Sequence, residues 1–73
     1  MIDDTFLKEN GFVKEEKDGV YDLWMFKGTN ILFRQKKGAK FGTIGIDLNG
    51  CFFFAISKKL FFKYELKQII DSL

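Results

Sequence analysis

Histidine is absent from this sequence, and cysteine occurs once, at Cys51. A single thiol cannot form a disulfide within the chain, and without histidine the ordinary zinc clusters of small domains cannot form. The Ser-His-Asp and Cys-His arrangements of hydrolases are excluded for the same reason. The folded state must therefore be stabilised by apolar packing.

Long apolar runs are also lacking. The longest, Cys51–Ile56, has six residues, whereas a membrane-spanning helix needs about 20. The chain begins Met1-Ile2-Asp3-Asp4, which does not have the basic and apolar regions of a signal peptide. Together with the lone thiol, these features lead us to expect a protein of the bacterial or viral cytoplasm with no membrane anchor.

Apolar residues are nonetheless plentiful, since hydrophobic residues make up 47% of the 73 residues and ten of the residues are Phe. A chain of this length forms one compact domain, residues 1–73, and each Phe carries a large apolar area. Burial of apolar surface stabilises the folded state by about 25 cal/mol per Å², and the loss of conformational entropy opposes folding by about 1.5 kcal/mol per residue. In so short a chain the two free energies roughly cancel. We therefore expect a marginally stable domain that a partner would stabilise.

Two helices are predicted, one near each end. The first covers about residues 4–9, with Asp3 as its N-cap, Ile2 and Leu7 in the staple positions, and Asn10-Gly11 at its end. The second begins after Lys59, where the apolar period changes to about 3.6 residues. Its apolar stripe consists of Phe62, Leu66, Ile69, Ile70 and Leu73.

Five strands are predicted between the helices. Their ranges are Phe12–Lys17, Val20–Lys27, Ile31–Lys36, Phe41–Leu48 and Cys51–Ser57. Every connection is too short for a crossover, so the strands form an antiparallel meander. The predicted fold class is α+β: a single antiparallel sheet of about five strands, with a short N-terminal helix and a C-terminal amphipathic helix packed on one face.

Two dipeptides, Asp18-Gly19 and Asn49-Gly50, are typical of two-residue hairpin turns. A two-residue turn at the second places Leu48 opposite Cys51. One face of that hairpin then carries the pairs Ile46/Phe53 and Ile44/Ala55. The other face carries Asp47/Phe52, Gly45/Phe54 and Thr43/Ile56.

The preceding hairpin also has large apolar side chains on both faces. One face holds Trp24, Phe26, Ile31 and Phe33, and the other holds Tyr21, Leu23, Met25 and Leu32 with Arg34 and Lys36. Two short helices can cover only one face. We therefore predict that the face with Tyr21, Leu32, Phe52 and Phe54 is exposed and binds a partner or a second copy. The alternative is that sheet curvature or the segment Leu60-Phe61-Phe62 hides it.

Charge is unevenly distributed along the chain. Residues 1–22 hold seven acids against three lysines, whereas residues 23–46 hold five bases and no acid. The basic block either contacts a partner or only solubilises a hairpin tip. The predicted partner-binding residues are Tyr21, Arg34, Lys36, Lys37, Lys40, Phe52 and Phe54.

Nothing in the sequence indicates catalysis. Cys51 lies beside a turn with no base nearby, which is typical of a packing residue. The acid pairs Asp3-Asp4 and Glu15-Glu16 fall at a helix N-terminus and on an exposed strand, and the glycines do not have a phosphate-binding spacing. We expect a protein that is not an enzyme and that holds no cofactor or metal.

Nucleic-acid binding is a weaker alternative. Lys40-Phe41-Gly42 beside Phe52 and Phe54 is similar to the basic and aromatic strands of RNA-binding sheets. An RNA-recognition fold, however, needs a helix between its first strands, and the acidic N-terminal third would repel a polyanion. Autonomous nucleic-acid binding is therefore disfavoured.

The whole chain loosely resembles small proteins of bacteriophages and mobile elements that have a helix, a β-meander and a second helix. The resemblance is carried by Phe6-Leu7-Lys8-Glu9-Asn10-Gly11-Phe12, by the aromatic hairpins, and by residues 64–73, Tyr-Glu-Leu-Lys-Gln-Ile-Ile-Asp-Ser-Leu. Some such proteins inhibit bacterial immunity, including anti-CRISPR proteins. That group shares no binding motif, so no site residue can be transferred from it.

The resemblance implies a non-enzymatic inhibitor of a bacterial immune effector. Its partner would be the effector protein or a ribonucleoprotein, bound directly or at its RNA channel. The sequence leaves two alternatives open. One is a small basic regulator that binds RNA or DNA, and the other is a structural homodimer.

Overall fold

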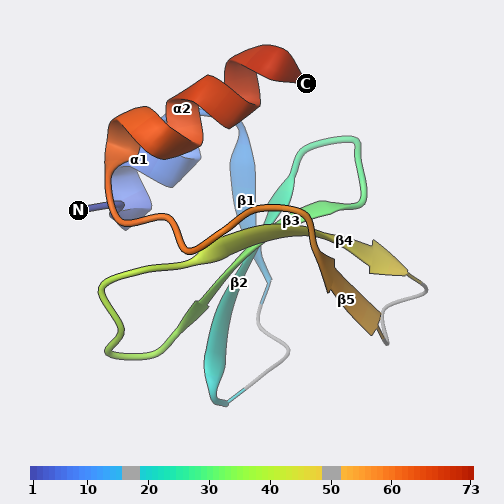
Figure 1. Cartoon of the computed structure of the whole chain (residues 1–73). Coiled ribbons are helices and arrows are strands. Elements are labelled where there is room, and N and C mark those ends of the chain that lie inside the picture. The colour runs from blue at the N-terminus through green and yellow to red at the C-terminus, as the bar shows by residue number, and fades with distance from the viewer. Residues whose placement is uncertain (16–18, 49–51) are drawn as a thin grey trace.

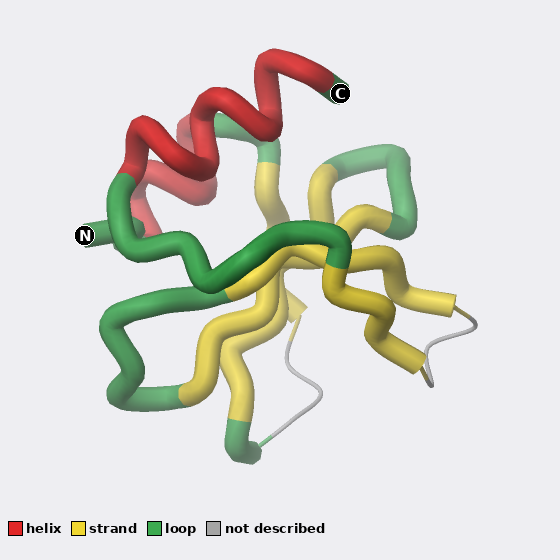
Figure 2. The backbone as a smooth tube through the Cα atoms, viewed as in Figure 1, coloured by secondary structure: helices red, strands yellow, loops and turns green. Residues whose placement is uncertain are grey.

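The computed structural model describes residues 1–15, 19–48 and 52–73. In chain order it contains α1 (Asp4–Glu9), β1 (Phe12–Glu15), β2 (Tyr21–Phe26), β3 (Ile31–Lys36), β4 (Thr43–Leu48), β5 (Phe52–Ala55) and α2 (Lys63–Ser72). The strands form one antiparallel sheet in the order β1-β2-β3-β4-β5. Both helices lie together on one side of it (Figures 1 and 2). The predicted α+β meander is confirmed, with β2, β4 and β5 slightly shorter than predicted.

Helix α1 is a single short helix whose two ends are both capped. Asp3 is the N-cap, and its Oδ1 accepts a hydrogen bond of 2.9 Å from the N–H of Phe6. This bond, assisted by Lys63, lowers the pKa of Asp3 below its usual value. The chain leaves the helix through Gly11, whose φ of +89° favours glycine. A helix this short depends on packing, and its Leu7 is buried.

Helix α2 begins where Glu65 caps the preceding turn. Its Oε1 accepts hydrogen bonds of 2.9 Å from the N–H groups of both Phe61 and Phe62, and these bonds lower the pKa of Glu65. The predicted stripe is confirmed at its centre, where Leu66 is fully buried. Phe62 and Leu73 were placed in the stripe but are exposed, because they lie just outside the helix at its two ends.

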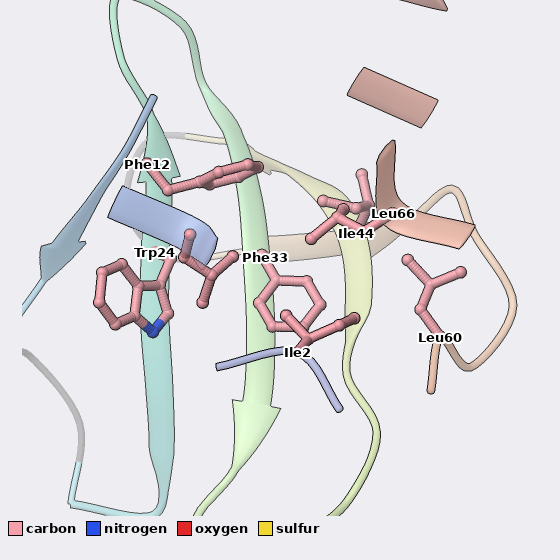
Figure 3. Close-up of a cluster of buried hydrophobic side chains, with 8 residues drawn as sticks. Ile2, Phe12, Trp24, Phe33, Ile44, Leu60 and Leu66 are labelled. Atoms are coloured by element: carbon pink, nitrogen blue, oxygen red, sulfur yellow. The ribbon is translucent and has the colours of Figure 1, made fainter. Parts of the chain in front are cut away.

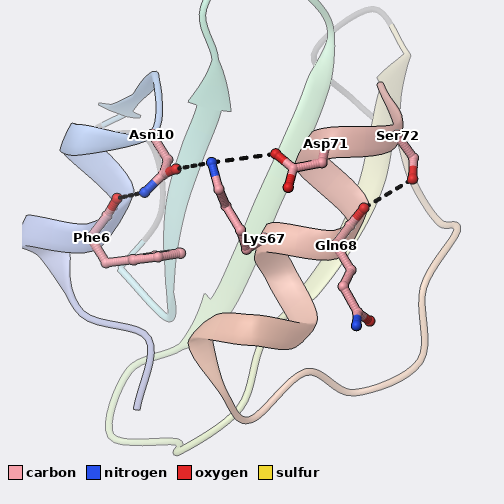
Figure 4. A network of polar contacts seen from close by, with 6 residues as sticks. All are labelled: Phe6, Asn10, Lys67, Gln68, Asp71 and Ser72. Carbon is pink, nitrogen blue, oxygen red and sulfur yellow. Dashed lines mark hydrogen bonds and ion pairs between the residues drawn. The ribbon is translucent and has the colours of Figure 1, made fainter.

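The two helices are joined along their solvent side by a polar network (Figure 4). Lys67 Nζ of α2 donates a hydrogen bond of 3.3 Å to Asn10 Oδ1 at the end of α1 and forms an ion pair of 3.3 Å with Asp71. Asn10 Nδ2 in turn donates to the carbonyl oxygen of Phe6. Such exposed contacts contribute at most about 1 kcal/mol each, so the main stabilisation comes from the core.

The core lies between the helices and one face of the sheet (Figure 3). Its buried members are Ile2, Leu7, Phe12, Trp24, Phe33, Ile44, Leu60 and Leu66. Trp24 in β2 pairs with Phe33 in β3, which pairs with Ile44 in β4, so these three side chains share the covered face. The predicted assignment of β2 and β3 side chains to two faces is therefore confirmed.

Leu60 reaches the core because the chain returns to β4 after β5. The N–H of Leu60 donates a hydrogen bond of 2.8 Å to the carbonyl oxygen of Gly42, and the N–H of Gly42 donates one of 3.0 Å to the carbonyl oxygen of Leu60. The ring of Phe33 occupies the space that a side chain at Gly42 would need. The chain between Ile56 and Leu60 is thereby held across the start of β4.

The predicted register of the last hairpin is wrong by one residue. Leu48 pairs with Phe52, and not with Cys51, so three residues lie between the paired positions instead of two. Because side chains alternate, this shift moves each β5 residue to the opposite face from the one predicted. Asn49, Gly50 and Cys51 lie outside the described residues.

The first hairpin differs from its prediction in the same way. A two-residue turn at Asp18-Gly19 would place Glu15 opposite Asp22, but Glu15 pairs with Leu23. Asp18 itself lies outside the described residues.

In the part of the chain that the structure describes, no helix has the length and apolar character needed to cross a membrane.

Candidate binding surface on the open sheet face

The helices leave one face of the sheet uncovered, which we call the open face. Alternation along the strands places on it Val13 and Glu15 of β1, Tyr21, Leu23 and Met25 of β2, Leu32, Arg34 and Lys36 of β3, Thr43, Gly45 and Asp47 of β4, and Phe53 and Ala55 of β5. Of these side chains only Leu32, at the centre, is buried. The prediction that the helices leave this face uncovered is therefore correct. The predicted exposure of Leu32 is wrong, because its neighbours on the sheet bury it, and Tyr21 is only half-buried.

Arg34 lies at the centre of the open face between two aromatic rings, an arrangement we call the Arg34 clamp. Its guanidinium carbon is 4.5 Å from the ring centroid of Tyr21 and 4.1 Å from that of Phe53. Tyr21 comes from β2, next to β3, whereas Phe53 comes from β5, two strands away. The two ring contacts hold the guanidinium on the open face, and its N–H groups are the part that can bind a ligand.

Phe53 can reach Arg34 because the residue between them is a glycine. A Cβ on Gly45 in β4 would lie 2.5 Å from Phe53 Cζ and 2.5 Å from the carbonyl oxygen of Phe54. The ring of Phe53 therefore lies over β4 above Gly45. Gly45 pairs with Leu32, which is buried at the centre of this face.

The charge of Arg34 is not neutralised within the described part of the chain. All ion pairs there involve lysines, namely Lys14, Lys37, Lys63 and Lys67. No hydrogen bond from the Arg34 side chain occurs among the described residues either. A guanidinium remains charged at any ordinary pH and has five N–H donors in a plane. The clamp therefore presents a fixed positive group that fits a carboxylate or a phosphate.

The structure brings together some of the predicted partner-binding residues and separates others. Tyr21 and Arg34 are in contact, and the exposed Lys36 lies on the same face two residues along β3. Lys37 instead forms an ion pair of 3.9 Å with Asp22, whose strand position belongs to the covered face. Lys40 lines a separate hollow of about 190 Å³ with Met1, Phe61 and Phe62.

The two phenylalanines predicted for the open face are not on it. The observed register puts Phe54 on the same face as Ile46, beyond the area that the helices cover, where it is 56% exposed. Phe52 pairs with Leu48 on that face by its backbone position, and its side chain lies outside what the structure describes. The error follows from the turn length, because each residue added to a hairpin loop exchanges the faces of the next strand.

Sequence reasoning missed Phe53 and Gly45, the two residues that complete the clamp. Residues 52–54 are three consecutive phenylalanines, so the hydrophobic pattern alone does not say which of them faces the open side. The signal that could have found them is Gly45, since a glycine inside a strand often marks a place where another group approaches the backbone closely.

Two other surface features lie away from the open face. A groove of about 360 Å³ runs between the chain after β5 and helix α2, lined by Ile56, Ser57, Lys58, Leu60, Tyr64, Glu65, Gln68 and Ile69. Two aromatic pairs, Phe41 with Phe61 and Phe62 with Tyr64, lie near the start of α2, and we call them together the aromatic cluster. Across residues 1–15, 19–48 and 52–73, no three metal-ligating side chains are grouped in a way that could hold an ion.

Comparisons of the chain with protein-family models, with curated proteins and with solved structures gave no match. Its function is therefore inferred from its own residues.

Proposed function

We propose that this domain is a non-catalytic protein-binding module whose open face docks onto a carboxylate-bearing surface of a larger protein. The observation that carries the proposal is the Arg34 clamp: a guanidinium held between Tyr21 and Phe53 with no acidic partner among the described residues. Arg and Tyr are enriched among the residues that dominate binding energy at interfaces. A guanidinium that is already oriented also loses less entropy when it binds.

The surroundings of the clamp support the same proposal. Leu23 and Met25 are half-buried beside it, and Val13 at the margin is 54% exposed. Lys36 adds a second positive charge on the same face. An apolar centre with one Arg anchor and a charged rim is the usual composition of a protein interface, and the rim charge accelerates association with an acidic partner.

The resemblance to small phage and mobile-element proteins suggests a narrower partner class. On that basis the partner is an effector protein of bacterial immunity, of the kind that anti-CRISPR proteins inhibit, met in the bacterial cytoplasm. The domain would act by occupying a surface that the effector needs, and not by catalysis.

The test is capture of partners by the tagged protein from a nuclease-treated host lysate, followed by affinity measurement with the purified partner. Arg34→Met keeps an apolar stem between the two rings but removes the charge and the N–H donors. We expect it to weaken binding by about 30-fold or more, which corresponds to an interface hot spot of about 2 kcal/mol. Lys27→Met, an exposed change in the β2–β3 turn, is the matched control and should bind like the wild type.

The proposal fails if the wild-type protein captures no protein, or if Arg34→Met and Lys27→Met bind the partner equally well. Circular dichroism of both variants shows whether the fold is intact, so a loss of binding is not confused with unfolding.

A second candidate, binding of single-stranded nucleic acid, is favoured by the aromatic cluster. The rings of Phe41 and Phe61 lie 5.5 Å apart, and Lys59 Nζ is 4.9 Å from the Phe41 centroid. Phe62 stacks on Tyr64 at 5.8 Å, and both rings are more than half exposed. Exposed rings with lysines beside them can stack bases and contact phosphates. This cluster is separate from the Arg34 clamp, so variants can distinguish the two candidates.

A further inference from the structure

The two edge strands of the sheet differ in how well they are protected against pairing with another strand. β1 carries the charged residues Lys14 and Glu15, and α1 packs beside it. β5 carries no charge from Phe52 to Ile56, and the side chains of Phe54 and Ile56 are each 56% exposed. Figure 1 shows β5 at the margin of the sheet, away from both helices. An uncharged, exposed edge strand is a template for strand addition.

The outward-facing backbone groups of β5 can be identified from its pairing with β4. The N–H of Ile56 bonds to the carbonyl oxygen of Ile44 at 2.8 Å. Hydrogen-bonded positions alternate along an antiparallel pair, so Phe54 also directs its backbone groups to β4. Phe53 and Ala55 consequently direct their N–H and C=O groups towards the open edge.

We propose that β5 pairs antiparallel with β5 of a second copy of this chain, with the two-fold axis passing beside Phe54. In this register the backbone N–H and C=O groups of Phe53 form hydrogen bonds with those of Ala55 of the second copy. By symmetry, those of Ala55 do so with Phe53 of the second copy. Phe54 then lies opposite Phe54 of the second copy at a non-hydrogen-bonded position, where side chains approach most closely. The two exposed rings cover each other on the helix side of the sheet.

Several features favour a second copy over an unrelated strand. The edge has no charge, so two copies meet without repulsion between like charges. Phe53 lies opposite Ala55, so a large side chain is paired with a small one on the open face. The ring of Phe53 already leans away from the edge, over Gly45, so this ring does not cover the outward-facing backbone groups of β5.

The dimer joins two open faces into one. A two-fold axis perpendicular to the sheet keeps both sets of helices on one side and both Arg34 clamps on the other. The ten strands then form a continuous sheet, and a partner meets two clamps side by side. The inference does not depend on the proposed function, because β5 pairing uses no atom of Arg34 or Tyr21.

Sedimentation equilibrium of the full chain over a wide concentration series tests the association. We expect the wild type to be a dimer and Phe54→Lys to raise the dimer Kd by about 100-fold or more, since the burial of two Phe rings is lost and two lysines then lie opposite each other at the axis. Val13→Lys is the matched control, because Val13 is 54% exposed in the other edge strand. It should dimerise like the wild type. A monomeric wild type, or equal dimer Kd values for the two variants, would overturn the proposal.

The register is tested by disulfide trapping in a Cys51→Ser background, which removes the one native thiol. Phe54→Cys places two thiols on strands whose Cα atoms are about 4.5 Å apart, within the range that a disulfide spans. Mild oxidation should cross-link it at least about tenfold faster than Val13→Cys. Equal rates of cross-linking for the two variants would show that β5 does not pair at Phe54.

Discussion

The ring of Phe53 in β5 lies over Gly45 in β4, so closely that a Cβ at Gly45 would stand 2.5 Å from its Cζ atom. From there the ring stacks on the guanidinium of Arg34 in β3, whose carbon is 4.1 Å from the ring centroid. Because Gly45 has no side chain, Phe53 of the edge strand β5 can contact Arg34 of the central strand β3.

Replacing Gly45 by Ala should therefore affect both stability and the clamp. The backbone oxygen of Phe54 also lies 2.5 Å from the new Cβ, so the strand and the ring must both move. Overpacking of this kind costs about 1–3 kcal/mol. Urea denaturation should show this loss in the free energy of unfolding, and near-UV circular dichroism should show a changed environment of the aromatic rings.

Gly19→Ala is the control for that change. Among the described residues, no atom lies within 4 Å of a Cβ added at Gly19, and its φ is not in the left-handed region. We expect a change within about 0.5 kcal/mol. A similar loss in both variants would show that contact with Phe53 is not the cause.

Ser57 should contribute to stability through the backbone of β4. Its Oγ accepts a hydrogen bond of 2.8 Å from the N–H of Ile44, a fully buried residue. Ser57→Ala leaves that N–H without its partner, which costs about 1–3 kcal/mol. Ser72→Ala removes only an exposed bond to the carbonyl of Gln68 and should cost less than about 0.5 kcal/mol. Chemical denaturation of the two variants measures the difference, and equal losses would contradict this role.

The stability of the domain should decrease in acid through its two helix caps. Backbone N–H groups lower the folded-state pKa values of Asp3 and Glu65. The unfolded chain therefore takes up protons first as the pH falls. The stabilisation is complete above the unfolded-state values of about 4 and is lost as the pH falls through the lower folded-state values.

Thermal unfolding followed over that pH range checks this expectation. Tm should fall with decreasing pH below about 4 in the wild type. The double variant Asp3→Asn with Glu65→Gln should have a lower Tm at neutral pH and a flatter profile in acid. An unchanged acid slope in the double variant would exclude the caps as the cause.

The geometry of Arg34, and not only its charge, should determine affinity for the protein partner. Arg34→Lys keeps one positive charge but loses the planar group that stacks between Tyr21 and Phe53 and its paired N–H donors. We expect the Kd to rise by about tenfold or more. Lys36→Gln, on the same strand and face, should mainly slow association. Surface plasmon resonance measures the association and dissociation rates separately. If Arg34→Lys bound with wild-type affinity, the charge alone would account for binding and the prediction would be wrong.

Salt dependence should distinguish the nucleic-acid candidate from the protein-binding one. If Lys40 and Lys59 contact two phosphates of a single strand, the slope of log K against log salt should be about −1.4. Lys59→Gln should reduce it to about −0.7, whereas Arg34→Met should leave it unchanged. Gel shifts at several salt concentrations measure these slopes. A slope that responds to Arg34→Met would place nucleic acid on the open face instead.

Local patterns were enough to predict most of the fold. Asp3 and Asn10-Gly11 mark the ends of α1, and the alternation around Trp24 and Phe33 assigns β2 and β3 to their two faces. These features depend on residues close together in the sequence, where caps and alternation act directly. The failed predictions concerned the registers of the first and last hairpins, each of which differs by one residue from the register that its Asp-Gly or Asn-Gly dipeptide indicated.

The sequence by itself determined the order of elements, the helix caps and a surplus of aromatic residues, since each of these follows from neighbouring residues. Only the tertiary structure decided that Phe53 reaches Arg34, whereas Phe54 lies on the opposite face. Three identical side chains in a row fit either face equally well, so their pattern cannot select a register. The selection comes from the space above Gly45, which exists only once β3, β4 and β5 lie side by side.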